Sequence, residues 1–352
     1  MLLSYIVDPF LDPSKLVATN HTNYWEAVKI AESYLNLGFR VDVVAFGNRT
    51  FVPEKPYDVV IDSRHNLERW TPLVGPDCVR VFHIDTSHIL FHNAAESQRL
   101  LALQQRRAVT LQPHRFERPN LGIEHADCAT LLGNEATERT FRYAGKPMYR
   151  LPVPSAYRWP WPKDKDWAAC RRRYLFLASA GMVHKGLDLV LEAFAARPEF
   201  ELFVCAPVDP RPLGLHYRTA QPHNVSPDTN RFAYAGAMYE EQDFRRAYAR
   251  ELYETPNIHT VGWVDVASPQ FLDLVSSCAG IIHPSCSEGA STAVVTGMHA
   301  ALIPILTYES GIDTGEFGFT LDPVSVEHLG DAVARLAALS PSLVEKRARA
   351  AW

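Results

Sequence analysis

The chain has 352 residues and a formal net charge of −5 at neutral pH. This length is enough for two α/β domains that each bury a core of their own. The slightly acidic balance excludes nucleic acid as a principal partner, because binding a phosphate backbone requires an excess of basic residues on one surface.

Cysteine usage indicates a reducing compartment, and hydropathy indicates that no segment spans a membrane. The six cysteines are dispersed, with no C-x-x-C pair. The first eight residues lack a basic leader and soon meet Pro9, so we expect a first strand there instead of a signal peptide. No apolar run approaches the ~20 residues that span a bilayer. We therefore expect a cytoplasmic protein without a transmembrane segment. The basic run 171–173 is expected to be a solvated linker end, with peripheral membrane contact as the less favoured alternative.

The first half of the chain alternates strands with helices. Strands are predicted at 2–7, 41–46, 58–61, 79–84 and near 129–132, and helices at about 23–37, 94–107 and 135–143. This alternation predicts a parallel sheet covered by helices. We therefore expect a first Rossmann-like domain, on the acceptor side, over residues 1–151.

A segment rich in proline and tryptophan divides the two halves. Proline disfavours both a helix and a central strand, so residues 152–170 are expected to form the interdomain linker. Asp164 and Asp166 give this segment a D-x-D sequence, but no strand precedes them and we assign no metal site to them.

The second half repeats the alternation. Strands are predicted at 174–178, 202–205, 258–261, 280–283 and 303–307. We expect a second Rossmann-like domain over residues 171–352. Residues 207–237 are rich in proline and polar side chains and are longer than a usual strand-to-helix connection, which predicts an insertion. This insertion is either a surface loop or a contact for an acceptor or a second subunit.

The most informative segment is the turn that follows the strand at 280–283. Its sequence is His283-Pro284-Ser285-Cys286-Ser287-Glu288-Gly289, which puts a carboxylate and a glycine between a buried strand and a helix. Free N–H groups and the positive end of that helix would attract a diphosphate at residues 289–292. The alternative is an ordinary turn in which Glu288 is a first-turn acid.

A second segment, residues 175–188, predicts a strand, a loop, a lysine and a helix start. Lys185 precedes Gly186, and an apolar helical stripe follows over residues 187–194. Together with the sequence Val-Gly-Trp-Val at 261–264, these segments resemble the carboxyl-terminal domain of the retaining GT-B glycosyltransferases of the group usually called family 4. The resemblance is specific from about residue 174 to residue 319 and looser before it.

The resemblance implies a GT-B fold, in which two Rossmann-like domains face each other across a cleft. It implies transfer of a sugar from a nucleotide-diphosphate sugar to an acceptor hydroxyl, with retention of the anomeric configuration and with no metal and no cofactor. In the family, a lysine before a glycine holds the donor diphosphate, and a Pro-Ser-x-x-Glu-Gly turn holds the donor sugar and phosphates. The acceptor would be a saccharide, a glycolipid or a protein.

The same resemblance assigns roles to residues of this chain. Glu288 is the expected catalytic residue that orients the sugar hydroxyls, and His88 is expected on the opposing wall of the cleft. The donor would contact ten residues, namely Gly181, Lys185, Trp263, Val264, Ser285, Gly289, Ala290, Ser291, Thr292 and Thr296.

Polar residues near strand ends of the first domain are candidates for the acceptor side of the cleft. His21, Thr22 and Asn23 enter the helix after the first strand, at the edge where open α/β sheets bind ligands. Capping of that helix is the alternative role for one of these polar side chains. His83, near the end of the fourth strand, is the other candidate.

Three histidines, His83, His88 and His92, invite assignment of a zinc site. No carboxylate or cysteine completes a convincing ligand spacing with them, so no metal is predicted.

Two positions depart from the family pattern. The arginine that normally lies five positions before the lysine is Ala180, and the glutamate eight positions after the first is Thr296. One cation for the diphosphate and one acceptor for the ribose are therefore missing. The alternative function is a non-catalytic or degenerate GT-B subunit that binds a saccharide or supports a partner enzyme. A nucleotide-sugar epimerase of similar architecture fits the Pro-Ser-x-x-Glu-Gly turn less well.

Overall fold

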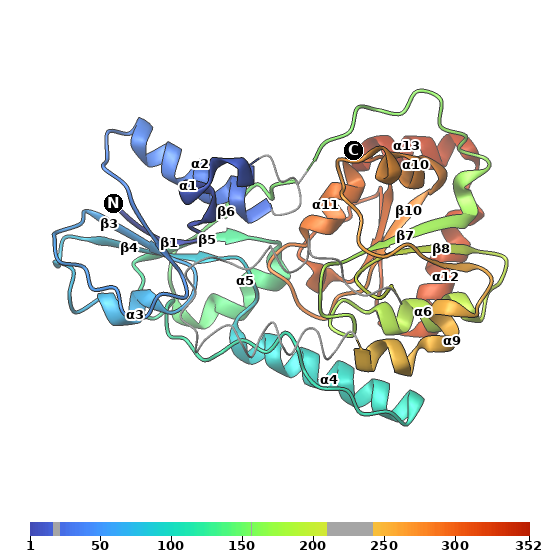
Figure 1. Ribbon diagram of the computed structural model, residues 1–352, viewed down its shortest axis with the longest axis horizontal. Helices are drawn as coiled ribbons and strands as arrows, with labels where there is room; N and C mark the ends of the chain where they lie inside the picture. The colour runs from blue at the N-terminus through green and yellow to red at the C-terminus, as the bar shows by residue number, and fades with distance from the viewer. Residues whose placement is uncertain (17–21, 156, 210–241) are drawn as a thin grey trace.

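The computed structural model describes residues 1–16, 22–155, 157–209 and 242–352. The strands form two parallel sheets of six strands each, and Figure 1 shows the two sheets side by side with helices around both. The predicted α/β class is confirmed. His21 and positions 210–237 of the predicted insertion lie outside the described residues. Within the described ranges, no helix is both long enough and apolar enough to cross a membrane.

The first sheet has the order β2-β1-β3-β4-β5-β6, and each neighbouring pair is parallel. Its strands are β1 (Leu2–Tyr5), β2 (Asp42–Ala45), β3 (Val59–Asp62), β4 (Val79–Ile84), β5 (Cys128–Leu132) and β6 (Met148–Leu151). Strand β4 has the predicted bounds. The edge strand β6 was not predicted, because Tyr149 and Arg150 at its centre are exposed and no continuous apolar run marks it.

Helices of the first half cover this sheet and extend beyond it. They are α1 (Asp8–Leu11), α2 (Thr22–Asn36), α3 (Asn66–Trp70), α4 (Ile89–Arg107) and α5 (Glu135–Phe141), with short 3₁₀ turns at Pro13–Leu16 and Arg142–Ala144. Helix α4 begins five residues before its predicted start. Figure 1 shows α4 leaving the first sheet and running below α6 and α9 of the second half.

The second sheet has the order β12-β11-β10-β7-β8-β9 and is also parallel. Its strands are β7 (Arg173–Leu177), β8 (Glu201–Cys205), β9 (Ile258–Thr260), β10 (Gly280–His283), β11 (Ile303–Leu306) and β12 (Phe319–Thr320). Its helices are α6 (Leu187–Ala195), α9 (Ala249–Tyr253), α10 (Pro269–Ser277), α11 (Thr292–Met298), α12 (Val326–Ala337) and α13 (Pro341–Ala351), with 3₁₀ turns at Cys170–Arg172 and Tyr308–Ser310.

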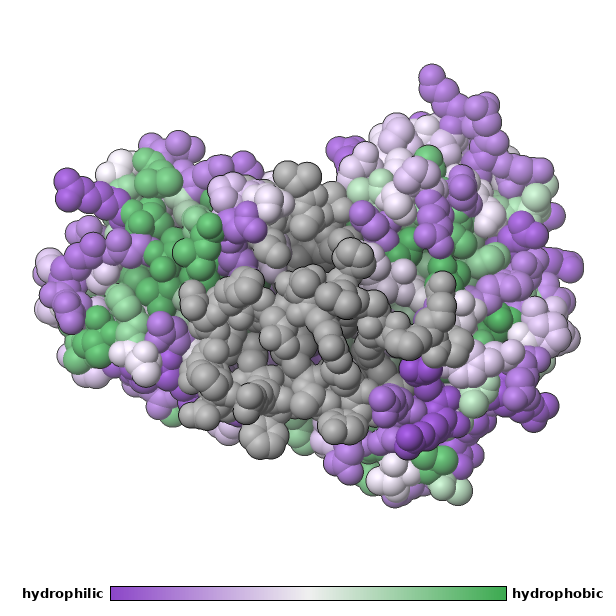
Figure 2. All heavy atoms as spheres, in the orientation of Figure 1, coloured by the Kyte–Doolittle hydropathy of each residue, from purple (hydrophilic) through white to green (hydrophobic). Residues whose placement is uncertain are grey.

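Apolar side chains pack on both faces of each sheet. In β1, Leu2 belongs to one hydrophobic cluster and Leu3 to another, because successive side chains of a strand point to opposite faces. In β7, Phe176 and Leu175 are divided between two clusters in the same way. Figure 2 shows polar and apolar side chains intermixed on one face of both halves.

The segment between β6 and β7 is held by aromatic side chains. Trp161 stacks on Trp167, with ring centroids 5.6 Å apart. Trp352, at the end of α13, donates its indole N–H to the carbonyl oxygen of Trp159 at 3.0 Å. Asp166 of the D-x-D sequence accepts from the backbone amides of residues 168 and 169, each at 2.9 Å, so its carboxylate is used to form a turn.

Candidate functional site

The strand order of the second sheet reverses between its two central strands. β7 comes first along the chain, with β8 and β9 on one side of it and β10, β11 and β12 on the other. Ligands of open α/β sheets bind at such a reversal, outside the carboxyl ends of the strands. The segments that leave these two ends carry Lys185 after β7 and Glu288 after β10.

Lys185 and Glu288 meet as a buried ion pair at this reversal. The Lys185 ammonium donates to Oε1 of Glu288, and Ser285 Oγ donates to the same oxygen at 2.7 Å. The two side chains are 13% and 11% exposed. Burial raises the pKa of Glu288, but the charge of Lys185 and the His283 ring, whose Nε2 lies 3.7 Å from Oε1, outweigh burial and hold that pKa well below its ordinary value of 4.5. Glu288 is therefore an anion at neutral pH.

Gly186 allows the two loops to touch. Its φ is +81°, and a Cβ at this position would lie 2.6 Å from the carbonyl oxygen of Pro284. Glycine adopts this left-handed conformation without strain and leaves the space that a Cβ would fill. The backbone N–H of Cys286 then donates to the carbonyl of His184 at 2.9 Å. A larger residue at 186 would push Lys185 away from Glu288.

The first domain covers the turn at Glu288 and Gly289. A Cβ on Gly289 would overlap the carbonyl group of Asp85, which directly follows β4. Ser87 Oγ donates to the carbonyl oxygen of Glu288 at 2.7 Å, and Thr137 Oγ1 donates to that of Gly289 at 2.8 Å. The two domains are therefore in direct contact at the segment where a diphosphate was predicted.

One of the backbone amides predicted to hold a diphosphate is already engaged. The N–H of Ser291 donates to the carbonyl oxygen of Ser310 at 2.9 Å. Thr292 is the first residue of α11, which has seven residues. Ala290 packs beside the small apolar cluster that contains Val294. This part of the turn is thus tied to its own domain as well as covered by the other.

His88 lies next to the covered turn but its ring faces the first domain. It is the N-cap residue of α4, and its Nδ1 accepts from the amide of Leu90 at 3.4 Å. Its Nε2 lies 3.1 Å from the hydroxyl of Tyr143, which donates to Glu124 at 2.5 Å. Burial lowers the pKa of His88 below its ordinary value of 6.5. Both ring nitrogens are thus occupied by protein groups.

The remaining predicted donor residues divide into buried and accessible ones. Thr296 is 2% exposed, and its hydroxyl donates to the carbonyl of Thr292 within the same helix at 2.8 Å. Val264 is buried in a hydrophobic cluster, whereas the neighbouring Trp263 is 45% exposed. Gly181 has a φ of +76° and lies against the side chain of Arg115.

The predicted acceptor residues that the structure describes lie in the first domain, whereas Lys185 and Glu288 belong to the second. His83 is buried within the sheet, where its Nδ1 lies 2.8 Å from Thr130 Oγ1 and its Nε2 lies 3.2 Å from Glu26 Oε1. Thr22 is buried at the start of α2, and its hydroxyl donates to the side chain of Asn23 at 3.3 Å. The structure thus brings Lys185 together with Glu288, but neither with His83.

Sequence reasoning missed a charged group at the carboxyl edge of the first sheet. Arg64, which follows β3, forms an ion pair with Asp85, which follows β4, and its Nε lies 3.9 Å from Glu117. Arg64, Asp85 and Glu117 line a cavity of about 10 Å³, together with His88. The signal was available, because Asp85 directly follows the strand predicted at 79–84 and Arg64 lies three residues after the strand predicted at 58–61.

Arginines of α4 join the first domain to the second. Arg99 donates to the carbonyl oxygen of Pro284 at 2.9 Å. Arg106 donates to Asp188, which is fully buried, at 2.7 Å, and to Glu192 at 3.0 Å. The charge of Arg106 is thus matched by two acidic residues of α6.

Comparison with known proteins gives a fold but no sequence family. No family model matches the chain, and no curated protein matches it. Solved structures do match. Anabaena Alr3699/HepE in complex with UDP-glucose has a TM-score of 0.52 and 14% identity, covering 84% of this chain and 74% of that one.

Two further structures give the same result. A UDP-forming α,α-trehalose-phosphate synthase from Burkholderia xenovorans has a TM-score of 0.52 and 10% identity, covering 94% of this chain and 74% of that one. The apo structure of OtsA has a TM-score of 0.53 and 10% identity, covering 94% of this chain and 73% of that one. At these identities the likeness shows the fold alone. The predicted GT-B fold, with two Rossmann-like domains, is confirmed.

Proposed function

We propose that this protein is a glycosyltransferase that moves a sugar from a nucleotide-diphosphate sugar to the hydroxyl of a saccharide, glycolipid or protein acceptor, with the anomeric configuration retained. The observation that carries the proposal is the meeting of Lys185 and Glu288 at the strand reversal of the second sheet. Support comes from the fold, which is shared with the HepE structure that holds UDP-glucose.

The chemistry of such a transfer suits a cation and an anion at this place. Negative charge develops on the departing diphosphate, and a preorganised ammonium group stabilises it. Positive charge develops on the sugar ring, which a carboxylate stabilises. In the proposal, Lys185 binds the diphosphate, Glu288 orients the sugar hydroxyls, and His88 lies on the facing wall.

Donor binding requires that the contacts around Lys185 and Glu288 change. Lys185 and Glu288 are partners of each other, and the segment from Asp85 to Ser87 covers Gly289. We propose that the donor diphosphate replaces Glu288 as the partner of Lys185 and that Glu288 then turns to the sugar. Separation of Asp85 from Gly289 gives the donor access, and renewed contact excludes water, which favours transfer over hydrolysis.

Calorimetric titration of the full chain with UDP-, GDP- and ADP-sugars tests the proposal. We expect one of them to bind with about 1:1 stoichiometry and to be transferred or slowly hydrolysed. The Lys185→Met variant should bind that nucleotide sugar more weakly. The matched control is Lys29→Met, because Lys29 is exposed and pairs with Glu32 on the surface of α2. Failure of every nucleotide sugar to bind the wild-type chain would refute the proposal.

A second function, a non-catalytic saccharide-binding or scaffold subunit of GT-B fold, has its own supporting observation. The Thr296 side chain is 2% exposed and carries no carboxylate, so position 296 offers a ribose no charged acceptor. A subunit of this kind would bind a saccharide or a partner enzyme while leaving every nucleotide sugar intact. Mass spectrometry of donor incubated with the chain and a saccharide separates the two functions.

A further inference from the structure

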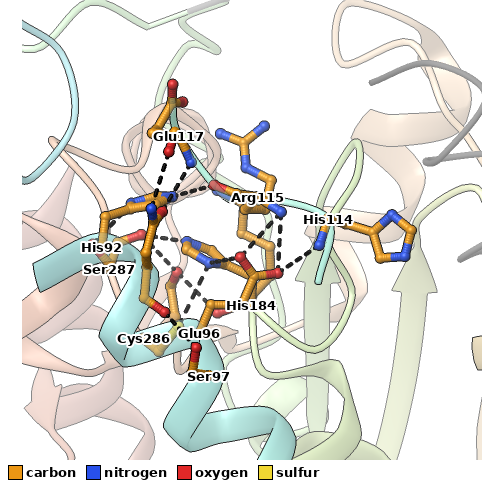
Figure 3. Close-up of polar contacts among 12 residues, drawn as sticks. His92, Glu96, Ser97, His114, Arg115, Glu117, His184, Cys286 and Ser287 are labelled. Atoms are coloured by element: carbon orange, nitrogen blue, oxygen red, sulfur yellow. Dashed lines mark hydrogen bonds and ion pairs between the residues drawn. The ribbon is translucent and has the colours of Figure 1, made fainter. Parts of the chain in front are cut away.

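The buried face of helix α4 carries polar residues where a core helix normally carries apolar ones. His92, Glu96, Arg99 and Leu103 are its buried residues, at the spacing of one helical face. Burial of a polar side chain is unfavourable unless it has partners. Figure 3 shows His92 and Glu96 pointing from α4 toward His184, which belongs to the loop after β7.

These three side chains form a compact buried cluster between the two domains. One ligand atom from each of His92, Glu96 and His184 lies within 4.8 Å of the others. Oε2 of Glu96 lies 3.8 Å from Nδ1 of His184, and the two imidazole rings are 4.7 Å apart between centroids. The three residues are 0–1% exposed. Solvent therefore does not screen the charge of the Glu96 carboxylate.

Hydrogen bonds to backbone carbonyls fix which nitrogen of each ring carries a proton. Nε2 of His92 lies 2.6 Å from the carbonyl oxygen of Arg115, and Nε2 of His184 lies 2.5 Å from that of Ser287. A carbonyl oxygen can only accept, so both Nε2 atoms are donors. The Nδ1 atom of each neutral ring consequently offers a lone pair. In His92 this lone pair faces the hydroxyl groups of Ser287 and Thr86, at 3.1 and 3.3 Å, which a metal ion would replace.

Nδ1 of His184 faces the buried Glu96 carboxylate and the Cys286 thiol. It lies 3.8 Å from Oε2 of Glu96 and 3.6 Å from Sγ of Cys286. Oε1 of Glu96 accepts from the backbone amides of His114 and Arg115, at 2.9 and 3.0 Å, and Oε2 accepts from that of Arg115 at 3.1 Å. A carboxylate oxygen keeps a lone pair after such a bond, so Oε2 and Nδ1 of His184 can both bind a metal ion.

Three features favour the metal ion. Metal-binding histidines generally donate their second N–H to a carbonyl oxygen or a carboxylate, and both rings here do so. Ligating carboxylates are themselves hydrogen-bonded, as Glu96 is. A fourth donor is at hand, because Sγ of Cys286 lies 3.6 Å from Nδ1 of His184.

We propose that His92, Glu96, His184 and Cys286 bind a divalent transition-metal ion of the zinc type between the two domains. Two imidazoles, a carboxylate and a cysteine sulfur are a donor set that suits zinc and does not suit magnesium or calcium, which require oxygen ligands. Burial raises the pKa of the Cys286 thiol to about 12, so binding of the ion would have to release the thiol proton. The sequence grouping of His83, His88 and His92 could not reveal this site, since the other three ligands come from the next turn of α4 and from the second domain.

The ion would act as a clamp and not as a reactant. His184 precedes Lys185, and Cys286 lies two residues before Glu288, so the metal would hold α4 against both loops that carry the buried ion pair. It would fix the contact between the domains without touching a donor. The proposal is independent of the proposed transferase function, because it concerns a site that binds metal with or without a nucleotide sugar.

Metal titration of the purified full chain tests the site. The chain is stripped with a chelator, dialysed and titrated with Zn²⁺ in a calorimeter. We expect one equivalent to bind and the thermal unfolding temperature to rise. Co²⁺ in place of Zn²⁺ should give the intense visible bands of a tetrahedral ion together with a sulfur-to-cobalt band. Cys286→Ser should remove the sulfur band and keep a bound cobalt ion.

Matched variants distinguish the cluster from adventitious surface binding. Glu96→Gln keeps the shape of the side chain and an oxygen for the two backbone amides, and we expect it to weaken Zn²⁺ binding at least about 100-fold, since even an outer-shell partner contributes about 10- to 100-fold. His114→Gln is the control, because Figure 3 shows that the ring of His114 points away from the cluster, and its affinity should equal that of the wild type.

Several outcomes would overturn the proposal. The first is that the stripped wild type binds no stoichiometric Zn²⁺. The second is that wild type and Glu96→Gln bind Zn²⁺ with equal affinity, and the third is that the cobalt spectrum of the wild type has no sulfur band. If circular dichroism shows that Glu96→Gln does not fold, Cys286→Ser decides the matter. This variant removes a single ligand, and loss of the sulfur-to-cobalt band in it would identify Cys286 as that ligand.

Discussion

The Lys185 ammonium donates to the carboxylate of Glu288 across the two loops that follow the central strands β7 and β10. Each side chain is thereby the charge partner of the other inside the protein. Removing one of them affects folding as well as any ligand, so a test of function must separate the two effects.

Replacing Lys185 by methionine leaves a buried carboxylate without its counter-ion. We expect a loss of roughly 3–5 kcal/mol in the free energy of unfolding, the usual cost of breaking a buried pair from one side. The double variant Lys185→Met, Glu288→Gln should recover most of this loss, because no charge is then left unpaired. Urea unfolding of the single and double variants measures both. Equal stability of wild type and Lys185→Met would show that Glu288 is not held by this lysine.

Nucleotide-sugar affinity should fall by about 1.5–3 kcal/mol in the Lys185→Met, Glu288→Gln background relative to Glu288→Gln alone, the scale of a hydrogen bond to a charged group. Glu288→Gln leaves Lys185 without its counter-ion, so urea unfolding must first show that both variants are folded under the conditions of the titration. Calorimetry with the binding nucleotide sugar is the measurement. Superimposable titrations for the two variants would remove Lys185 from the donor site.

Glu288→Gln should lower the rate of transfer more than it lowers nucleotide affinity. Glutamine keeps the shape and one acceptor oxygen but loses the charge that stabilises a cationic sugar in the transition state. Single-turnover transfer and equilibrium binding must both be measured, because turnover alone combines the two effects. Equal transfer rates with the correct donor would assign Glu288 to the structure of the turn.

Acid should destabilise the wild type more than Glu288→Gln. The pKa of Glu288 is lowered in the folded state, so its contribution to stability is complete above the ordinary value of 4.5 and is lost as the pH falls below that value toward the folded-state pKa. Unfolding free energies of both proteins from pH 7 to pH 3 give the comparison. Parallel curves below pH 4.5 would contradict a depressed pKa.

Thr296→Glu should destabilise the chain without improving nucleotide binding. Thr296 is buried and bonded within α11, so a carboxylate there would lose its water and find no cation. We expect a loss of about 3 kcal/mol or more in unfolding free energy. Thr296→Val, which keeps the branched shape, is the control and should cost less. Tighter UDP-sugar binding by a stable Thr296→Glu variant would show that position 296 faces the ribose.

The sequence predicted the strands better than it predicted elements with a polar buried face. β4 and β10 have their predicted bounds because β-branched or aromatic apolar residues mark both, although each also contains a histidine. The start of α4 was placed too late, at 94 instead of Ile89. Its buried face is polar, so hydrophobic periodicity could not mark it. Some partners of that face lie far away in sequence, as with Arg99 and Pro284, which are 185 residues apart.

The candidate site shows the same division. Because both residues follow predicted strands, the sequence placed Lys185 and Glu288 at the same edge of the second sheet. In the structure both lie at that edge. It could not predict that they pair directly, because the separation of two loops depends on the packing of Gly186 against Pro284. It also placed His83 at the cleft, whereas this histidine is hydrogen-bonded to Thr130 and lies beside Glu26 inside the first domain.

Helix α4 sets a limit on how this chain can be divided for experiments. Leu103 belongs to the main hydrophobic cluster of the second domain, and Arg106 and Arg107 are paired with acidic residues there. A fragment that ends after β6 would expose this half of the helix to water with its cations unpaired. A fragment that begins at β7 would lose the cations beside Asp188 and Glu251. Each half of the chain therefore supplies part of the folding environment of the other.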